Sequence, residues 1–210
     1  MIIFRDIFRP KIHVLDLGCG TGRIASYLAG DSLLITACDM NLAALRRFKI
    51  SFQAHQLPGI TACDARSLPF ADSCFDVIVF GFNGIDFIYP ASGRIDAYTE
   101  VERCLRPGGF FIFSSHNPIG TALSPRGIFS RSTWAWRLSY VKKSAFRDEY
   151  FEDPGGLLLF QVRPALLIRE VTQSTCLKFI YAVDRSGRVR SLKLLTLFCA
   201  WPYYVFQKVR

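Results

Sequence analysis

A glycine-rich segment near the start of the chain constrains the fold most. Residues 12–17 read Ile-His-Val-Leu-Asp-Leu, and Gly-Cys-Gly-Thr-Gly follows at 18–22. The short, mostly apolar run is typical of a buried parallel strand. Glycines directly after such a strand let the backbone come close to a ligand, and the helix that follows presents free N–H groups to negative charge. The segment therefore predicts a cofactor site at the first strand–helix turn.

Strands and helices alternate along the chain up to about residue 115. We expect further strands at 33–38, 60–63, 75–80 and 110–114, and helices at 21–29, 42–52 and 94–105. Pro107-Gly108-Gly109 ends the last of these helices and turns the chain into the fifth strand. Short links between alternating elements predict an α/β fold with a doubly wound, mostly parallel sheet of Rossmann-like type.

The remainder of the chain has a different character. Residues 117–156 are rich in Arg, Ser, Gly and aromatic residues, and we interpret them as an insertion after strand five with some helix. An apolar run at 157–162, a helix at 164–173 and strands at 177–183 and 203–209 follow. The apolar stretch at 192–206 is short and contains Lys193 and Pro202, which favours a buried element over a membrane span. We expect residues 1–210 to form a single domain.

The glycine spacing separates two classes of cofactor. A dinucleotide-binding turn needs Gly-x-Gly-x-x-Gly, but the third glycine comes one position early here and Arg23 stands in its place. The string Asp16-x-Gly18-x-Gly20-x-Gly22 instead resembles the first motif of class I S-adenosylmethionine-dependent methyltransferases. The runs Phe-Asp-Val-Ile-Val-Phe at 75–80 and Leu-Arg-Pro-Gly-Gly at 105–109 are similar to the same family, and the likeness covers about residues 12–115.

The resemblance implies S-adenosylmethionine as cofactor and a set of residues that contact it. Asp39, at the end of the second strand, would accept hydrogen bonds from both ribose hydroxyls, and Asp64 would accept a hydrogen bond from the adenine amino group. The alternative is that each is an ordinary acid in a turn at a strand end, and the glycine turn weakens that alternative. The full expected cofactor set is Asp16, Gly18, Cys19, Gly20, Thr21, Gly22, Asp39, Met40, Asp64 and Ala65. The family also implies an antiparallel C-terminal strand.

Polar residues beyond strands four and five are candidates for contact with the methyl acceptor, because open α/β sheets bind ligands at the carboxyl ends of their strands. His116 is the candidate general base, since the pKa of histidine lies near neutrality; a loop histidine bonded to backbone is the alternative. Asn83 is the second catalytic candidate, with a plain turn residue as its alternative. The further candidates are Asp86, Tyr89 and Asn117.

Motifs that mark certain classes of methyl acceptor are absent from the sequence. No Asn/Asp-Pro-Pro-Tyr/Phe signature follows strand four, no Pro-Cys pair occurs, and no nucleic-acid-binding appendage is recognisable. We therefore expect a small-molecule acceptor and no nucleic acid partner. Two alternatives stay open: a non-catalytic cofactor-binding scaffold, and a methyltransferase acting on lipid at a membrane surface.

Charge is distributed unevenly along the chain. Residues 1–125 carry 11 basic and 11 acidic side chains, whereas residues 126–210 carry 15 and 6. An anionic partner would therefore meet the second part, unless the excess only solvates the surface. The aromatic and basic stretch at 126–147 suggests a lid over the site or packing on the sheet edge. We favour these over peripheral membrane contact, because no clean amphipathic period runs through the stretch.

The seven cysteines form no Cys-x-x-Cys pair, which indicates reduced thiols in a cytoplasmic protein and predicts no metal site. No signal peptide is apparent at the start of the chain. Two features depart from the family. Few residues precede the first strand, although family members begin with one or more helices there. The link at 174–177 also lacks the usual glycine, which puts the end of the domain in doubt but not the cofactor site.

Overall fold

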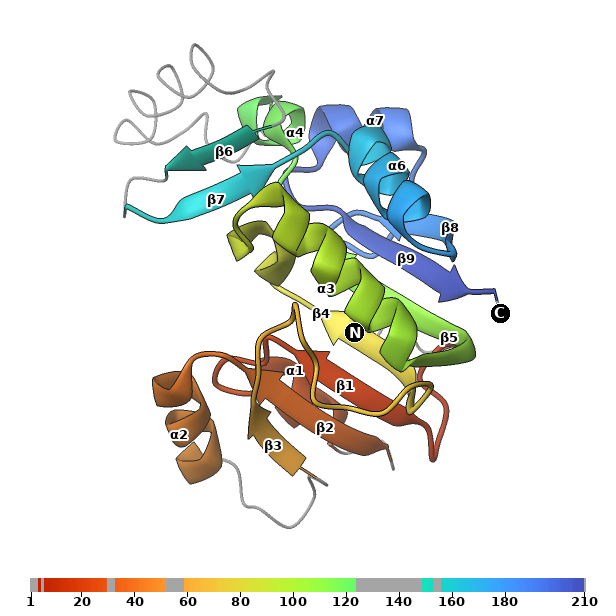
Figure 1. The fold of residues 1–210 in the computed structure, drawn as a ribbon. Coiled ribbons are helices and arrows are strands. Elements are labelled where there is room, and N and C mark those ends of the chain that lie inside the picture. Colours follow the sequence, from red (N-terminus) through yellow and green to blue (C-terminus); the bar gives the residue numbers. More distant parts are fainter. Residues whose placement is uncertain are drawn as a thin grey trace.

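A computed structural model describes residue 4 and residues 6–29, 33–51, 59–123, 149–152 and 156–209 (Figure 1). Within these residues the main sheet has seven strands in the order β3-β2-β1-β4-β5-β9-β8. Its strands are β1 (His13–Leu17), β2 (Leu34–Asp39), β3 (Gly59–Ala62), β4 (Phe75–Phe80), β5 (Leu105–Ser114), β8 (Leu177–Val183) and β9 (Tyr203–Lys208). A separate antiparallel pair joins β6 (Glu149–Glu152) to β7 (Leu158–Gln161).

Strand pairing confirms the predicted sheet. β1 lies between β2 and β4 and is parallel to both, and the parallel order continues to β3 on one side and β5 on the other. β9 runs antiparallel to both β5 and β8. The carboxyl ends of β1 to β5 and of β8 therefore lie at one edge of the sheet, together with the start of β9.

Helices cover both faces of the sheet (Figure 1). They are α1 (Arg23–Leu28), α2 (Leu42–Ser51), the 3₁₀ helix η2 (Gly84–Phe87), α3 (Ala91–Cys104), α4 (Pro118–Leu123), α6 (Pro164–Ser174) and α7 (Leu192–Phe198). One apolar core packs α1 and α2 on one side, and the other packs α3 and α6 on the opposite side. Alternate residues of each central strand feed the two cores: in β4, Val77 enters the first and Ile78 the second.

Two predicted boundaries were wrong between β4 and β5. α3 begins at Ala91 rather than at residue 94, because Pro90 ends the preceding turn and supplies the helix N-cap. β5 begins at Leu105 rather than at residue 110, because Leu105 already pairs with Phe75 across an irregularity in the ladder. The segment Pro107-Gly108-Gly109 is thus an irregular part of the strand. The close approach of Gly109 to the Asp76 carbonyl oxygen explains the glycine, since a Cβ there would lie 2.9 Å from that atom.

Part of the predicted insertion lies in the described chain. α4 and β6 belong to it, and β7 follows directly; the aromatic and basic stretch at 126–147 lies outside the described residues. The lid and the single-domain boundaries therefore stay predictions. No helix in the described parts of the chain is long and apolar enough to cross a membrane.

Candidate functional site

A pocket of about 560 Å³ opens at the carboxyl ends of β1, β2 and β4. Six of the ten expected cofactor residues line it: Gly18, Gly20, Asp39, Met40, Asp64 and Ala65. Strand order explains this meeting, because β1 pairs directly with both β2 and β4 and their ends lie side by side. The pocket has the size of small-molecule sites in general.

The three glycines of the turn serve different purposes. All three have positive φ angles, which L side chains adopt at a cost. A Cβ on Gly22 would lie 2.0 Å from the ring of buried Phe48, and one on Gly18 would lie 2.6 Å from the ring of Phe80. A Cβ on Gly20 would meet nothing within 4 Å. Gly18 and Gly22 therefore permit internal packing, whereas Gly20 keeps open the space that a ligand would occupy.

Asp39 is held in place by backbone amides. Its Oδ2 accepts the Gly20 N–H at 2.8 Å, and its Oδ1 accepts the Asn41 N–H at 2.7 Å. Each carboxylate oxygen has a second lone pair, so Asp39 can still accept two hydrogen bonds from a ligand in the pocket. The neighbouring Met40 side chain is 73% exposed at the pocket wall.

Asp64 has a partner that sequence reasoning missed. The guanidinium of Arg66 donates to both of its carboxylate oxygens, and the Arg66 backbone N–H donates to Oδ1. These hydrogen bonds lower the pKa of Asp64 and keep it ionised. Both residues line the pocket, so a ligand amino group that reaches Asp64 would share it with Arg66.

Asp16 lies beneath the turn and is 1% exposed. Its Oδ2 accepts the Ala25 N–H at 3.0 Å, while its buried Oδ1 has no partner among the described residues. Burial raises the pKa of this carboxyl to about 7, and the negative charge of Asp39 adds to the effect. The expected residues Cys19, Thr21 and Gly22 share the turn with Asp16 but do not line the pocket. Their contacts with a cofactor stay predictions.

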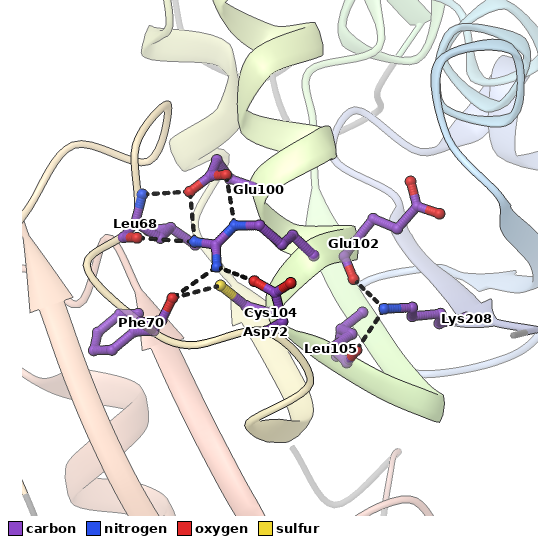
Figure 2. A network of polar contacts seen from close by, with 9 residues as sticks. Leu68, Phe70, Asp72, Glu100, Glu102, Cys104, Leu105 and Lys208 are labelled. Atoms are coloured by element: carbon purple, nitrogen blue, oxygen red, sulfur yellow. Dashed lines mark hydrogen bonds and ion pairs between the residues drawn. The ribbon is translucent and has the colours of Figure 1, made fainter.

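An arginine network holds the loop that carries Asp64 (Figure 2). Arg103 of α3 donates to the carbonyl oxygens of Leu68 and Phe70 and to the carboxylates of Asp72 and Glu100. Glu100 in turn accepts the Leu68 N–H at 2.7 Å. The pocket wall after β3 is therefore tied to the helix that precedes β5.

The two catalytic candidates, Asn83 and His116, meet beyond the ends of β4 and β5. The Asn83 Nδ2 atom lies 3.4 Å from His116 Nε2. Asn83 has a left-handed backbone at the start of η2, and its N–H donates to the Ser114 hydroxyl. Its Oδ1 is buried and unpartnered within the described chain. Because Phe82 and Gly84 line the pocket, Asn83 lies directly beside it.

Asp86 fixes the orientation of His116 through hydrogen bonds to its backbone and its ring. This fully buried carboxylate accepts the His116 backbone N–H at 2.7 Å and the Ser115 hydroxyl at 2.6 Å, and its Oδ2 lies 2.7 Å from His116 Nδ1. Burial raises the pKa of Asp86, and the hydrogen bonds from His116 and Ser115 oppose that rise. A carboxylate only accepts, so this contact requires a proton on Nδ1, and in the neutral ring Nε2 is then an acceptor. Asp86 and His116 were both sequence candidates, but nothing in the sequence indicated that they pair.

Two aromatic rings contact His116. Trp201, just before β9, meets its ring edge-on with centroids 5.9 Å apart, and Phe151 of β6 does so at 6.3 Å. Neither aromatic was a sequence candidate, because both are distant in sequence from β5. Of the remaining candidates, Tyr89 lines the pocket and is 61% exposed.

The prediction that Asn117 contacts the methyl acceptor was wrong. Asn117 is fully buried, and its amide nitrogen donates to the carbonyl oxygens of Leu195, Thr196 and Cys199. These carbonyl groups lie at the carboxyl end of α7, where helical N–H partners run out, and the Leu195 oxygen also accepts the Cys199 N–H. Asn117 therefore fixes α7 against the end of β5.

Residues 15–113 match the family model of a methyltransferase domain. This match identifies residues 15–113 as a methyltransferase domain. The match begins in β1 and ends in β5, which is close to the extent predicted from the motifs. The fold agrees: a SAM-dependent methyltransferase from Methanosarcina mazei shares 20% identity, covers 100% of this chain and 98% of its own, and superposes with a TM-score of 0.73.

Two curated relatives are similar to the methyltransferase domain in sequence. The phthiotriol/phenolphthiotriol dimycocerosates methyltransferase of Mycobacterium tuberculosis is 38% identical over 110 residues, which are 50% of this chain and 38% of the relative. The fatty-acid O-methyltransferase of Mycolicibacterium smegmatis is 36% identical over 111 residues, again 50% of this chain and 38% of the relative. The chain thus matches less than half the length of these relatives.

Proposed function

We propose that this methyltransferase domain binds S-adenosylmethionine in the pocket and transfers its methyl group to a hydroxyl of a small, apolar acceptor. The observation that carries the cofactor assignment is the joint placement of Gly20 and Asp39. One leaves room for a ligand against the backbone, and the other presents a fixed carboxylate with free lone pairs beside that room.

The residues present suit this cofactor. Asp39 would accept hydrogen bonds from the two ribose hydroxyls, and Asp64 would accept one from the adenine amino group. Met40 and Ala65 would lie against the adenine ring. The Oδ1 of buried Asp16 has no partner among the described residues, so an acceptor beneath the turn is left for a donor group of the ligand. Bound there, S-adenosylmethionine supplies a methyl group that is already activated by a positively charged sulfur.

The protein then has two tasks: alignment of the acceptor and removal of its proton. Because the methyl donor is activated, alignment and exclusion of water supply much of the rate. A base is needed only when the acceptor must lose a proton. In the neutral ring, His116 Nε2 can accept that proton in place of its 3.4 Å contact with Asn83 Nδ2. The Oδ1 of Asn83, which has no partner among the described residues, can accept a hydrogen bond beside it. This arrangement favours a hydroxyl acceptor.

The apolar character of the acceptor is supported by the surroundings of His116. Trp201 and Phe151 lie edge-on to its ring, and Phe82 and Phe87 are each 51% exposed at the pocket. Two of the similar relatives are named for methylation of a fatty acid and of dimycocerosates. Both observations favour an apolar small molecule over a nucleic acid.

Methyl transfer from labelled S-adenosylmethionine to a panel of apolar alcohols and phenols tests the proposal. We expect at least one methyl ether, and we expect His116→Gln to lower kcat by about 100-fold, within the range of general-base contributions. His13→Gln is the matched control, because His13 lies at the opposite end of β1 and contacts Thr36. It should retain kcat.

The outcomes separate the parts of the proposal. Binding of S-adenosylhomocysteine without transfer to any hydroxyl would support a cofactor-binding scaffold in place of an enzyme. Native kcat in His116→Gln would refute the base assignment alone.

A further inference from the structure

Arg185 is a cation on the far side of the Trp201 ring from the proposed base, and no carboxylate in the described chain forms an ion pair with it. It lies in the turn after β8 and is exposed, and its guanidinium carbon sits 4.5 Å from the centre of the Trp201 ring. Trp201 also contacts the ring of His116, so the indole touches both Arg185 and the proposed site. One indole therefore separates the Arg185 charge from His116.

Sheet register explains why these distant residues meet. Tyr203, the first residue of β9, pairs with Ser114 of β5 on one side and with Val183 of β8 on the other. His116 lies two positions beyond Ser114, Arg185 two beyond Val183, and Trp201 two before Tyr203. All three therefore leave the same edge of the sheet, at neighbouring strands.

The acid next to Arg185 is occupied by other partners. Asp184 Oδ1 accepts the backbone N–H groups of Ser186 and Arg188 and the Ser186 hydroxyl, and Oδ2 accepts Arg190 Nε at 2.9 Å. The turn thus directs Arg190 to Asp184 and leaves Arg185 on the indole face. A cation–π contact places a guanidinium without neutralising it.

A second arginine adds positive charge at this edge. Arg23 at the start of α1 lies with its guanidinium carbon 4.2 Å from the centre of the Phe82 ring. Both Arg23 and Arg185 act electrostatically on Tyr203 and oppose the rise in its pKa that burial causes. Negative charge on a bound molecule would be stabilised at this edge of the sheet.

We propose that Arg185 binds an anionic group of the acceptor, so that the substrate is an apolar hydroxy acid or a similar molecule with a hydroxyl and an anion. The apolar part lies along Trp201, the hydroxyl reaches His116 Nε2, and the anion pairs with the planar fork of Arg185. The proposal rests on the methyltransferase function proposed above and specifies its substrate class.

Matched pairs of probes isolate the charge. Calorimetric titration of the complex with S-adenosylhomocysteine compares ω-hydroxydecanoate with ω-hydroxydecanamide, and para-hydroxyphenylpropanoate with its amide. We expect at least one carboxylate to bind about tenfold more tightly than its amide, which corresponds to roughly 1.4 kcal/mol. The preference should shrink as salt is added, because the arginine is exposed.

Arg185→Gln should abolish the preference for the carboxylate, whereas Arg188→Gln should retain it. Arg188 belongs to the same turn, is exposed, and matches the change in net charge. Equal binding of acid and amide by the native protein, including no binding of either pair, would overturn the proposal, as would an unchanged preference in Arg185→Gln. Failure of S-adenosylhomocysteine to bind would instead refute the proposed function, so the two failures are distinguishable.

Discussion

Alanine at Gly20 and at Gly22 should produce different defects, although only one residue separates the two glycines. Both positions have positive φ, 55° at Gly20 and 84° at Gly22, so each substitution costs about 1–2 kcal/mol of backbone strain. Only Gly22→Ala also drives a methyl group into the Phe48 ring, at 2.0 Å. Such overpacking adds about 1–3 kcal/mol.

The summed cost for Gly22→Ala is about 2–5 kcal/mol, which corresponds to a fall in Tm on the order of 10 °C for a chain of this size. Gly20→Ala should lower Tm by only a few degrees, roughly what 1–2 kcal/mol gives. It should nevertheless remove cofactor binding, because its methyl group would stand in the space left for the ligand. Binding by Gly22→Ala should survive at temperatures where the variant is folded.

Thermal unfolding by circular dichroism without ligand, followed by titration with S-adenosylhomocysteine, measures both quantities. Native-like affinity in Gly20→Ala would refute the assignment of that space to a ligand. A Tm for Gly22→Ala that equals that of Gly20→Ala would refute the packing of Phe48 under the turn.

Three further substitutions have expected outcomes. The pKa of Asp16 in the folded protein is about 7, above the ordinary value of 3.8, so its contribution to stability is full below pH 3.8 and is lost as the pH rises through about 7. The loss amounts to up to about 4 kcal/mol. Asp16→Asn should remove this pH dependence, which urea unfolding at pH 4 and pH 8 measures. Glu170→Gln should lower the free energy of unfolding by about 3 kcal/mol without changing the m-value, because it leaves Arg94, 2% exposed, without its ion-pair partner. Asn117→Ala should cost about 1–3 kcal/mol, measured by urea unfolding, with cofactor affinity unchanged; a selective loss of acceptor binding would contradict its assignment to α7.

The pocket proposed for the cofactor could be predicted from the sequence because most of its expected residues follow one another in a fixed order. Asp39 and Asp64 each come at the end of an apolar run, and parallel strands bring such ends together. The glycine spacing argued against a dinucleotide, and the two acids then favoured S-adenosylmethionine. Local pattern and topology point to the same pocket there.

The acceptor half could not be predicted in the same way. The contact of Trp201 with His116 depends on the antiparallel register of β9 against β5, and nothing in a sequence pattern states a register between distant strands. The pairing of Arg66 with Asp64 depends on side-chain geometry within a loop. The interpretation of Asn117 failed because its position beyond β5 was informative, but the direction of its side chain was not.

Binding of S-adenosylhomocysteine to the unmodified chain decides whether the pocket at the ends of β1, β2 and β4 is a cofactor site. Isothermal titration should show one site per chain in the native protein and at least about tenfold weaker binding in Asp39→Ala, since two charge-assisted hydrogen bonds are lost. No binding heat with the native protein, or equal affinity in Asp39→Ala, would contradict the assignment of this pocket to S-adenosylmethionine.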